Sequence, residues 1–304
     1  MGELVVPTVE DAGRIAAVIN ARSQALHCIS EETAGGVAQW FKLPFLDPKG
    51  DMRLARAPDG AAEGYADVSL PEDGSKKAMV DVRVRPGAEV ALGLLVAWAQ
   101  ERAVERVGEG GRIQFFVDRN DHRLAGLLEG AGYAVVRAAY EMERDIEGDL
   151  EPPVWPQGLE VRTLDLRAGE AVHAAQDEAF AGDFFYLSVS HAVWLESLRS
   201  GGADSGLSSV VWDGDAVAGL CLARPAHGED ESIGWIGDLA VRVPWRRRGL
   251  GAALLRHSFR LFAGAGKRSA GLGVDRENAT GALALYERVG LRAVRQSNTW
   301  ERTT

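Results

Sequence analysis

The sequence predicts an α/β (α+β) protein made of two tandem domains, each a mixed, mostly antiparallel sheet flanked by helices. Three observations support this fold class: a length of 304 residues, a proline-rich segment near the middle, and the same order of strands and helices on either side of it. The length is roughly twice that of a typical domain. Strand and helix patterns alternate, but each half also holds a hairpin, so neither sheet is expected to be purely parallel.

The proline-rich segment marks the boundary. Three of the residues between 152 and 156 are proline, which fixes φ and lacks the N–H that a helix or a central strand needs. We therefore expect a first domain over residues 1–147, a linker over residues 148–158 and a second domain over residues 159–304.

Each half opens with a short apolar strand and an amphipathic helix. In the first half Thr8 and the acidic residues after it form a helix-start signal, and Ile15, Val18 and Ile19 form the apolar stripe. The paired elements that follow are helices 31–41 and 191–198, hairpins 52–68 and 210–222, strands 79–84 and 236–243, helices 90–104 and 249–262, and strands 113–117 and 270–274. A short helix, a glycine and a final strand close each half.

The two hairpins carry Asp-Gly at their turns, at Asp59-Gly60 and Asp213-Gly214, a strong hairpin signal. Corresponding features of the halves are offset by 154 to 159 residues. A near-constant offset over so many features indicates an internal duplication.

Composition excludes several classes of protein. The 34 basic and 44 acidic residues give a formal charge of −10, which argues against binding to nucleic acid or to an anionic membrane. No apolar run approaches a membrane span of ~18 residues, and the first residues lack the pattern of a signal peptide, so we expect a cytoplasmic protein. Two cysteines rule out a disulfide framework, and the scattered histidines have no metal-ligand spacing, so no metal is expected. The chain could be a monomer or a homodimer.

The segment richest in chemistry lies between the strand 236–243 and the next helix. It reads Arg246-Arg247-Arg248-Gly249-Leu250-Gly251. Glycines let the backbone approach a ligand closely, and a helix N-terminus offers unpaired N–H groups and a positive dipole end. Together they predict a phosphate cradle. The P-loop pattern is absent, and Leu254 stands where a dinucleotide-binding loop would need its third glycine.

This junction resembles motif A of the GNAT superfamily of acyl-CoA-dependent N-acyltransferases. Arg246, Gly249 and Gly251 fill the positions R/Q-x-x-G-x-G/A, and Asn278 and Tyr286 follow in the order that the family shows. The resemblance covers roughly residues 159–304. The tandem arrangement resembles that of the mycothiol synthases.

The resemblance implies that the second half binds acetyl-CoA as co-substrate and moves its acetyl group to a primary amine of a small molecule or peptide in one ternary complex. The implied binding residues are Leu239, Ala240, Val241, Arg246, Arg247, Arg248, Gly249, Leu250, Gly251, Ala252, Asn278 and Tyr286. Two alternatives stay open: an acetyl-CoA-binding or regulatory module without turnover, and an acyltransferase with a mycothiol-synthase-like acceptor.

Two residues are candidates for catalysis. The resemblance makes Tyr286 the general acid for the departing thiolate, and Asp238 is the first candidate for the base that frees the amine. The plainer alternatives are an aromatic ring packed on the core and a carboxylate bonded at a strand edge. Further candidate bases are Glu178, Asp183 and Glu231, and the aromatic run 184–186 could floor an acceptor pocket or pack in the core.

The first half departs from the motif at its functional points. Its equivalent loop, residues 86–92, lacks the paired glycines and carries Glu89, whose charge would repel phosphate; Leu128 stands opposite Tyr286. We expect this half to have lost its acetyl-CoA site and to serve a structural role or to shape the acceptor cleft.

Overall fold

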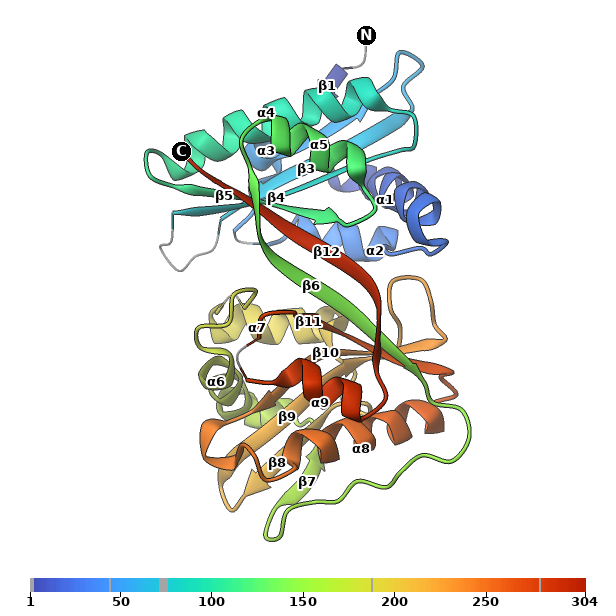
Figure 1. Ribbon diagram of the computed structural model, residues 1–304, viewed down its shortest axis with the longest axis vertical. Helices are drawn as coiled ribbons and strands as arrows, with labels where there is room; N and C mark the ends of the chain where they lie inside the picture. The colour runs from blue at the N-terminus through green and yellow to red at the C-terminus, as the bar shows by residue number, and fades with distance from the viewer. Residues whose placement is uncertain (1–2, 44, 71–75, 187, 279) are drawn as a thin grey trace. The chain divides into compact units, whose positions relative to one another are not determined.

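The computed structural model describes residues 3–43, 45–70, 76–186, 188–278 and 280–304. The chain forms two compact units. Unit 1 comprises Met1–Ala138, Gly228–Asp230 and Gln296–Thr304; unit 2 comprises Ala139–His227 and Glu231–Arg295. Each unit is a mixed sheet with helices on both faces, which confirms the predicted fold class (Figure 1).

The sheet of unit 1 has the strand order β1-β2-β3-β4-β5-β12. Its strands are β1 (Glu3–Val5), β2 (Met52–Arg56), β3 (Ala62–Ser69), β4 (Lys77–Val84), β5 (Arg112–Asp118) and the later part of β12 (Arg292–Thr303). Only the β4–β5 pair is parallel; the other neighbours within this sheet are antiparallel.

Two groups of helices cover the two faces of this sheet (Figure 1). The helices α4 (Glu89–Val107) and α5 (His122–Gly130) cover one face, and α1 (Ala12–His27) and α2 (Ala34–Trp40) the other, with η1 (Val9–Asp11) and α3 (Pro48–Asp51) as short additions. Successive strand residues point to opposite faces. On β3, Ala66 and Val68 therefore join the α4 core, whereas Tyr65 joins the α1 core.

The sheet of unit 2 has the strand order β6-β11-β10-β9-β8-β7. Its strands are the later part of β6 (Ala134–Asp145), β7 (Glu160–Thr163), β8 (Ser209–Asp213), β9 (Ala216–Arg224), β10 (Ile233–Val241) and β11 (Ser269–Asp275). Here the β10–β11 pair is the parallel one.

The helices of unit 2 repeat the arrangement. The elements α6 (Gly169–Phe180) and α7 (His191–Ser197) pack on one face, α8 (Leu250–Gly264) and α9 (Ala282–Arg288) on the other; η2 (Leu166–Ala168), η3 (Leu198–Gly202) and η4 (Val243–Trp245) connect them. No helix in the described part of the chain is long and apolar enough to cross a membrane.

The final strand of each half completes the sheet of the other unit. Residues 139–145 of β6 pair with β11, and residues 297–303 of β12 pair with β5. The compact units thus divide the chain differently from the predicted ranges 1–147 and 159–304. A local pattern specifies a strand, but the partner of that strand is a non-local choice.

The residues after β6 pack on unit 2. The predicted linker, residues 148–158, contains neither helix nor strand, as its prolines imply. Ile146 and Leu150 are buried in the unit 2 core, Arg260 donates to the Leu150 carbonyl (3.0 Å), and the ring of Trp155 meets that of His257 at 5.5 Å. This segment is therefore attached to α8 along its length.

Candidate active site

The strands β10 and β11 part in the middle of unit 2. Their parallel pairing joins Ile233–Ile236 to Ser269–Leu272, and in the described chain it ends there. A β-bulge follows, where the register of β10 on β9 shifts between Ile236 and Asp238. Beyond it β10 stays paired with β9, while β11 stays paired with β6. Backbone groups of Leu239–Val241 on the β11 side are thus left for a ligand.

Asp238 lies directly after the bulge. Its side chain is partly buried, and burial raises the pKa of its carboxyl to about 6, although the positive charge of Arg224 opposes the shift. Such a carboxyl is roughly 90% ionised at pH 7. It can therefore accept a proton near neutral pH, which is what a general base needs.

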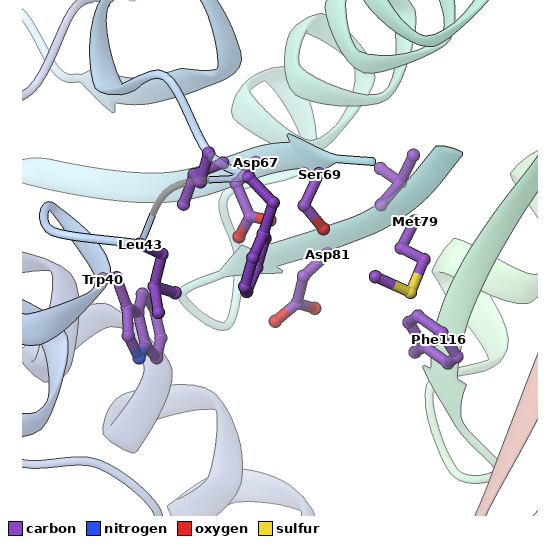
Figure 2. A pocket seen from close by; sticks show the side chains of 10 residues that line it. Trp40, Leu43, Asp67, Ser69, Met79, Asp81 and Phe116 are labelled. Carbon is purple, nitrogen blue, oxygen red and sulfur yellow. The ribbon is translucent and has the colours of Figure 1, made fainter. Parts of the chain in front are cut away.

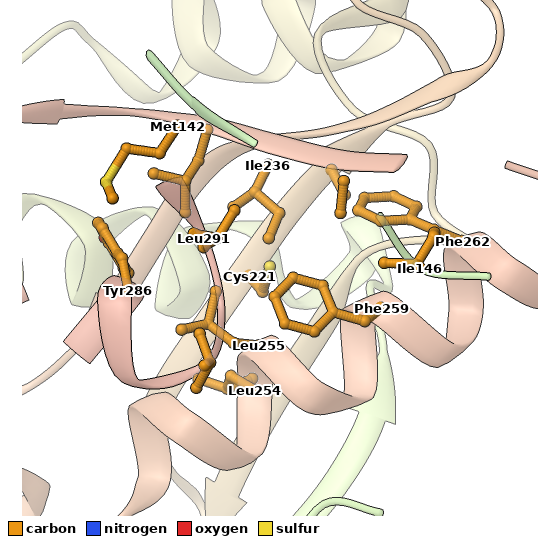
Figure 3. Packing of buried hydrophobic residues seen from close by; sticks show 14 of the residues in the cluster. Met142, Ile146, Cys221, Ile236, Leu254, Leu255, Phe259, Phe262, Tyr286 and Leu291 are labelled. Carbon is orange, nitrogen blue, oxygen red and sulfur yellow. The ribbon is translucent and has the colours of Figure 1, made fainter. Parts of the chain in front are cut away.

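Tyr286, on α9, is buried with 7% of its surface exposed. Its ring packs at the edge of the hydrophobic cluster drawn in Figure 3, together with Met142, Cys221 and Leu255. Burial raises the pKa of its hydroxyl well above the usual value, and negative charge at Cys221, Asp183 and Asp238 adds to the shift. The ring is thus part of the core, and the hydroxyl is close enough to Asp238 to feel its charge.

The loop before α8 has the backbone of an anion cradle. Arg247 and Gly249 both have positive φ values, 64° and 85°, and Gly249 is the N-cap of α8. The first helical bond runs from the Ala253 amide to the Gly249 carbonyl (3.0 Å). The amides of residues 250–252, at the helix N-terminus, precede this bond, so they are oriented outward toward a ligand.

The two motif glycines are needed for different reasons. A Cβ on Gly249 would meet nothing within 4 Å, so glycine is favoured there by φ alone. A Cβ on Gly251 would lie 3.0 Å from Cδ2 of Leu285, so the packing of α8 on α9 also favours a small residue.

The three arginines of the loop differ in what they do. The Arg246 guanidinium donates to the carbonyls of Val241 (2.8 Å) and Ala179 (2.9 Å), which fixes the loop to β10 and α6. Arg247 and Arg248 are exposed beside Gly249. Arg247 and Arg248 therefore place exposed guanidinium groups beside the cradle, whereas the Arg246 guanidinium is bound to backbone carbonyls.

The other candidate bases are either hydrogen-bonded to other side chains or exposed. Glu178 accepts two hydrogen bonds from Arg242 (2.5 and 2.9 Å), which lower the pKa of its carboxyl. Asp183 accepts from the side-chain amide of Asn278 (3.2 Å). Glu231 is exposed ahead of the first residue of β10. Asp238 therefore stands out as a carboxyl whose pKa is raised toward neutrality.

An aromatic group lies close to Asp238. The rings of Phe180 and Tyr186 stack at 5.0 Å, and the Tyr186 hydroxyl donates to Asp177 (2.7 Å). Burial, this hydrogen bond and the charges of Asp177 and Asp238 raise the pKa of Tyr186. Sequence reasoning missed Asp177, because a carboxylate on an amphipathic helix carries no signal that it will meet a tyrosine nine residues later.

Comparison with known proteins supports an acyltransferase. Residues 170–291 match the model of the acetyltransferase (GNAT) family. The chain is similar to a mycothiol acetyltransferase of Actinosynnema mirum, with 26% identity over 249 residues that cover 78% of each chain. It is also similar to the crystal structure of a GCN5-related N-acetyltransferase from Sphaerobacter thermophilus, with a TM-score of 0.79 and 28% identity over 99% of this chain and 95% of the other.

The two-unit architecture has a solved counterpart as well. A tandem GNAT protein from the clavulanic acid biosynthesis pathway matches with a TM-score of 0.76 and 16% identity, over 100% of this chain and 98% of that one. The family match falls on unit 2, where the parted strands, the cradle and Asp238 lie. Residues 170–291 thus form a GNAT-type acetyltransferase domain, and the fold of the whole chain is that of a tandem GNAT protein.

Proposed function

We propose that unit 2 transfers an acetyl group from acetyl-CoA to a primary amine of a small molecule or peptide, directly within one ternary complex. The observation that carries this proposal is the parting of β10 from β11 at the bulge beside Asp238. A gap between two strands offers backbone hydrogen bonds to an extended ligand, and the carboxyl at its edge can take up a proton.

The residues present suit acetyl-CoA, the co-substrate of the family. The amides of residues 250–252 and the exposed side chains of Arg247 and Arg248 would hold its pyrophosphate, because a helix N-terminus and guanidinium groups both favour phosphate. The open edge of Leu239–Val241 would take the amides of its pantetheine arm. Acetyl-CoA supplies an activated thioester.

Side chains and backbone groups of unit 2 would then transfer protons and stabilise the charge that develops during the reaction. An alkyl ammonium with a pKa near 10.4 is only about 0.04% neutral at pH 7, so Asp238 would accept its proton. As the new C–N bond forms and the C–S bond breaks, a backbone N–H near Val241 would stabilise the charge that develops on the carbonyl oxygen. The Tyr286 hydroxyl would donate its proton to the departing sulfur and regain one through water from the nitrogen of the new amide, which loses its second hydrogen.

Calorimetric titration of the full chain with acetyl-CoA tests the binding half of the proposal. We expect one site per chain, lost in Gly249→Val, because valine at a φ of 85° distorts the cradle. Gly264→Ala, at the other end of α8, is the matched control: a Cβ there meets nothing within 4 Å. Absence of binding by the wild type would contradict the proposal.

A screen of primary amines, read out by thiol release, tests the chemical half. Release that depends on both the amine and acetyl-CoA supports acetyl transfer. Tight binding of acetyl-CoA with no acetylation of any amine in the screen would instead identify a binding or regulatory module.

The similarity to a mycothiol acetyltransferase favours a second candidate acceptor. In that case unit 2 would act on a mycothiol-type amine, and formation of mycothiol should exceed acetylation of simple alkyl amines by orders of magnitude. Comparable rates with simple amines would favour the general reading.

A further inference from the structure

Unit 1 contains a pocket that the acetyl-transfer proposal does not use (Figure 2). It has a volume of about 240 Å³ and lies on the sheet face that α1 and α2 cover. That volume equals roughly eight water molecules, enough for a small organic molecule. Apolar side chains, the aromatic Trp40, Phe45 and Phe116 among them, form most of its wall.

Two carboxylates enter this apolar wall from adjacent strands. Asp67 on β3 and Asp81 on β4 are direct cross-strand partners, and both line the pocket (Figure 2). Arg83 binds Asp81 at 2.7 Å and also lies 3.5 Å from Glu31. Within the described part of the chain no ion pair is formed by Asp67. The carboxylates near the pocket thus outnumber the cationic groups that neutralise them.

Ser69 is a further polar group of the pocket that lacks a partner. It is 8% exposed, and its side chain points into the pocket in Figure 2. No hydrogen bond joins its hydroxyl to another residue that the structure describes. A ligand N–H group would satisfy it.

We propose that this pocket binds a small organic cation, an alkyl- or arylammonium, whose charged group lies between Asp67 and Asp81 and whose apolar part packs on the aromatic wall. A cation would relieve the repulsion between two carboxylates that face each other across the strands. The aromatic faces would add a cation–π contribution. An anion would be repelled, and a neutral molecule would leave Asp67 without an ion-pair partner among the described residues, since Arg83 binds Asp81.

The electrostatics of the pocket agree with this assignment. Burial and the charge of Asp81 raise the pKa of the Asp67 carboxyl to about 8, with Asp51 acting in the same direction and Arg83 and Tyr65 against it. At neutral pH a proton therefore occupies the place that we assign to the ligand cation. Binding should release this proton, so affinity should rise from pH 7 to pH 9 for a permanently charged ligand.

The position of the pocket fits this ligand class. Units 1 and 2 share their element order, so the α1/α2 face of unit 1 corresponds to the α6/α7 face of unit 2, where Ala240, the second residue after Asp238, packs. Unit 1 thus has a carboxylate-lined, aromatic pocket on the face that corresponds to this side of β10. The residues of the pocket all belong to unit 1, so ligand binding there does not depend on acetyl transfer by unit 2.

The test is a calorimetric titration of the full chain with benzylammonium at pH 8. We expect about one site per chain and at least tenfold weaker binding of benzyl alcohol, the neutral analogue. Asp67→Asn should lower the affinity for benzylammonium at least tenfold, because the amide keeps the shape of the carboxylate and removes its charge. Glu63→Gln, on the same strand but outside the pocket wall, removes the same charge and should leave the affinity unchanged.

A second variant tests the same pocket independently, in case Asp67→Asn does not fold. Ser69→Leu should fill the pocket and abolish binding, while thermal unfolding shows an intact fold. Equal affinity for benzyl alcohol and benzylammonium would overturn the proposal. So would undiminished binding in folded Asp67→Asn and Ser69→Leu, since the ligand would then occupy another site.

Discussion

The burial of Tyr286 determines how it could act as an acid. A phenol with a pKa above its usual value of about 10 is a poor proton donor to a thiolate of pKa near 8.5. It can still donate a hydrogen bond that strengthens as charge develops on sulfur. We expect Tyr286→Phe to lower kcat about 10²–10⁴-fold and to leave the affinity for acetyl-CoA nearly unchanged. Steady-state kinetics and calorimetry measure both; a loss of kcat below threefold would reduce Tyr286 to a packing residue.

Asp238 couples catalysis to stability. Its folded-state pKa of about 6 lies above the unfolded value near 3.9, so the folded state binds the proton more tightly and stability falls as pH rises from about 4 to about 6. Asp238→Asn removes this cost. The variant should gain roughly 1–3 kcal/mol in free energy of unfolding at pH 8 and match the wild type at pH 3.5, as denaturant titrations would show.

The same substitution should damage the reaction. In the wild type kcat/KM should fall about tenfold per pH unit below pH 6, because the protonated carboxyl cannot accept the proton of the amine. In Asp238→Asn this acidic limb should vanish, and activity at pH 8 should drop by about 10² or more. An unchanged pH profile would show that another group is the base.

The backbone of the junction between β10 and α8 could be predicted from the sequence, but the contacts of its side chains could not. The spacing of Arg246, Gly249 and Gly251 indicated a cradle, and the structure shows the positive φ and the helix N-terminus that a cradle needs. The motif spacing did not reveal that the Arg246 side chain binds the backbone carbonyls of Val241 and Ala179. A side chain's partners depend on three-dimensional neighbours that a short motif does not encode.

Gly251 has two possible roles, in the packing of α8 on α9 and in the close approach of a ligand, and a pair of substitutions distinguishes them. Gly251→Val should destabilise the protein, because a Cβ would lie 3.0 Å from Cδ2 of Leu285. The same substitution should lower the affinity for acetyl-CoA at least tenfold. Adding Leu285→Ala should recover part of the lost stability in a double-mutant cycle, since it removes the obstructing atoms. If affinity returns as well, the glycine serves packing alone; if it does not, the ligand needs the bare backbone.

The carboxylate-lined pocket of unit 1 shows where sequence reasoning stops. Asp67 and Asp81 lie within the predicted hairpin 52–68 and strand 79–84, whereas Ser69 lies one residue beyond the predicted hairpin. The alternation of these strands places the three side chains on one face. Their register, however, depends on how the strands pair, and the aromatic wall comes from α2, the residues after it and β5. A pocket assembled from such distant segments leaves no local signature.

The exchange of final strands has a consequence for how the chain can be divided. The predicted first domain, residues 1–147, lacks the part of β12 that pairs with β5 and carries the part of β6 that pairs with β11. Expressed alone, it would present two unpaired strand edges, which promote aggregation. We expect this fragment to be unfolded or aggregated by circular dichroism and size-exclusion chromatography.

A chimera that restores the missing strand makes that expectation specific. Residues 1–138 joined through a flexible linker to residues 296–304 contain every strand of the unit 1 sheet, with Thr299 and Trp300 restored beside β5. This chimera should unfold cooperatively and protect the β5 amides from hydrogen exchange, whereas the same chimera with the last nine residues scrambled should not. If residues 1–147 alone fold as well as the chimera, the strand β12 is dispensable to unit 1. The sequence boundary would then mark an autonomous domain, because its sheet would hold together without the last strand.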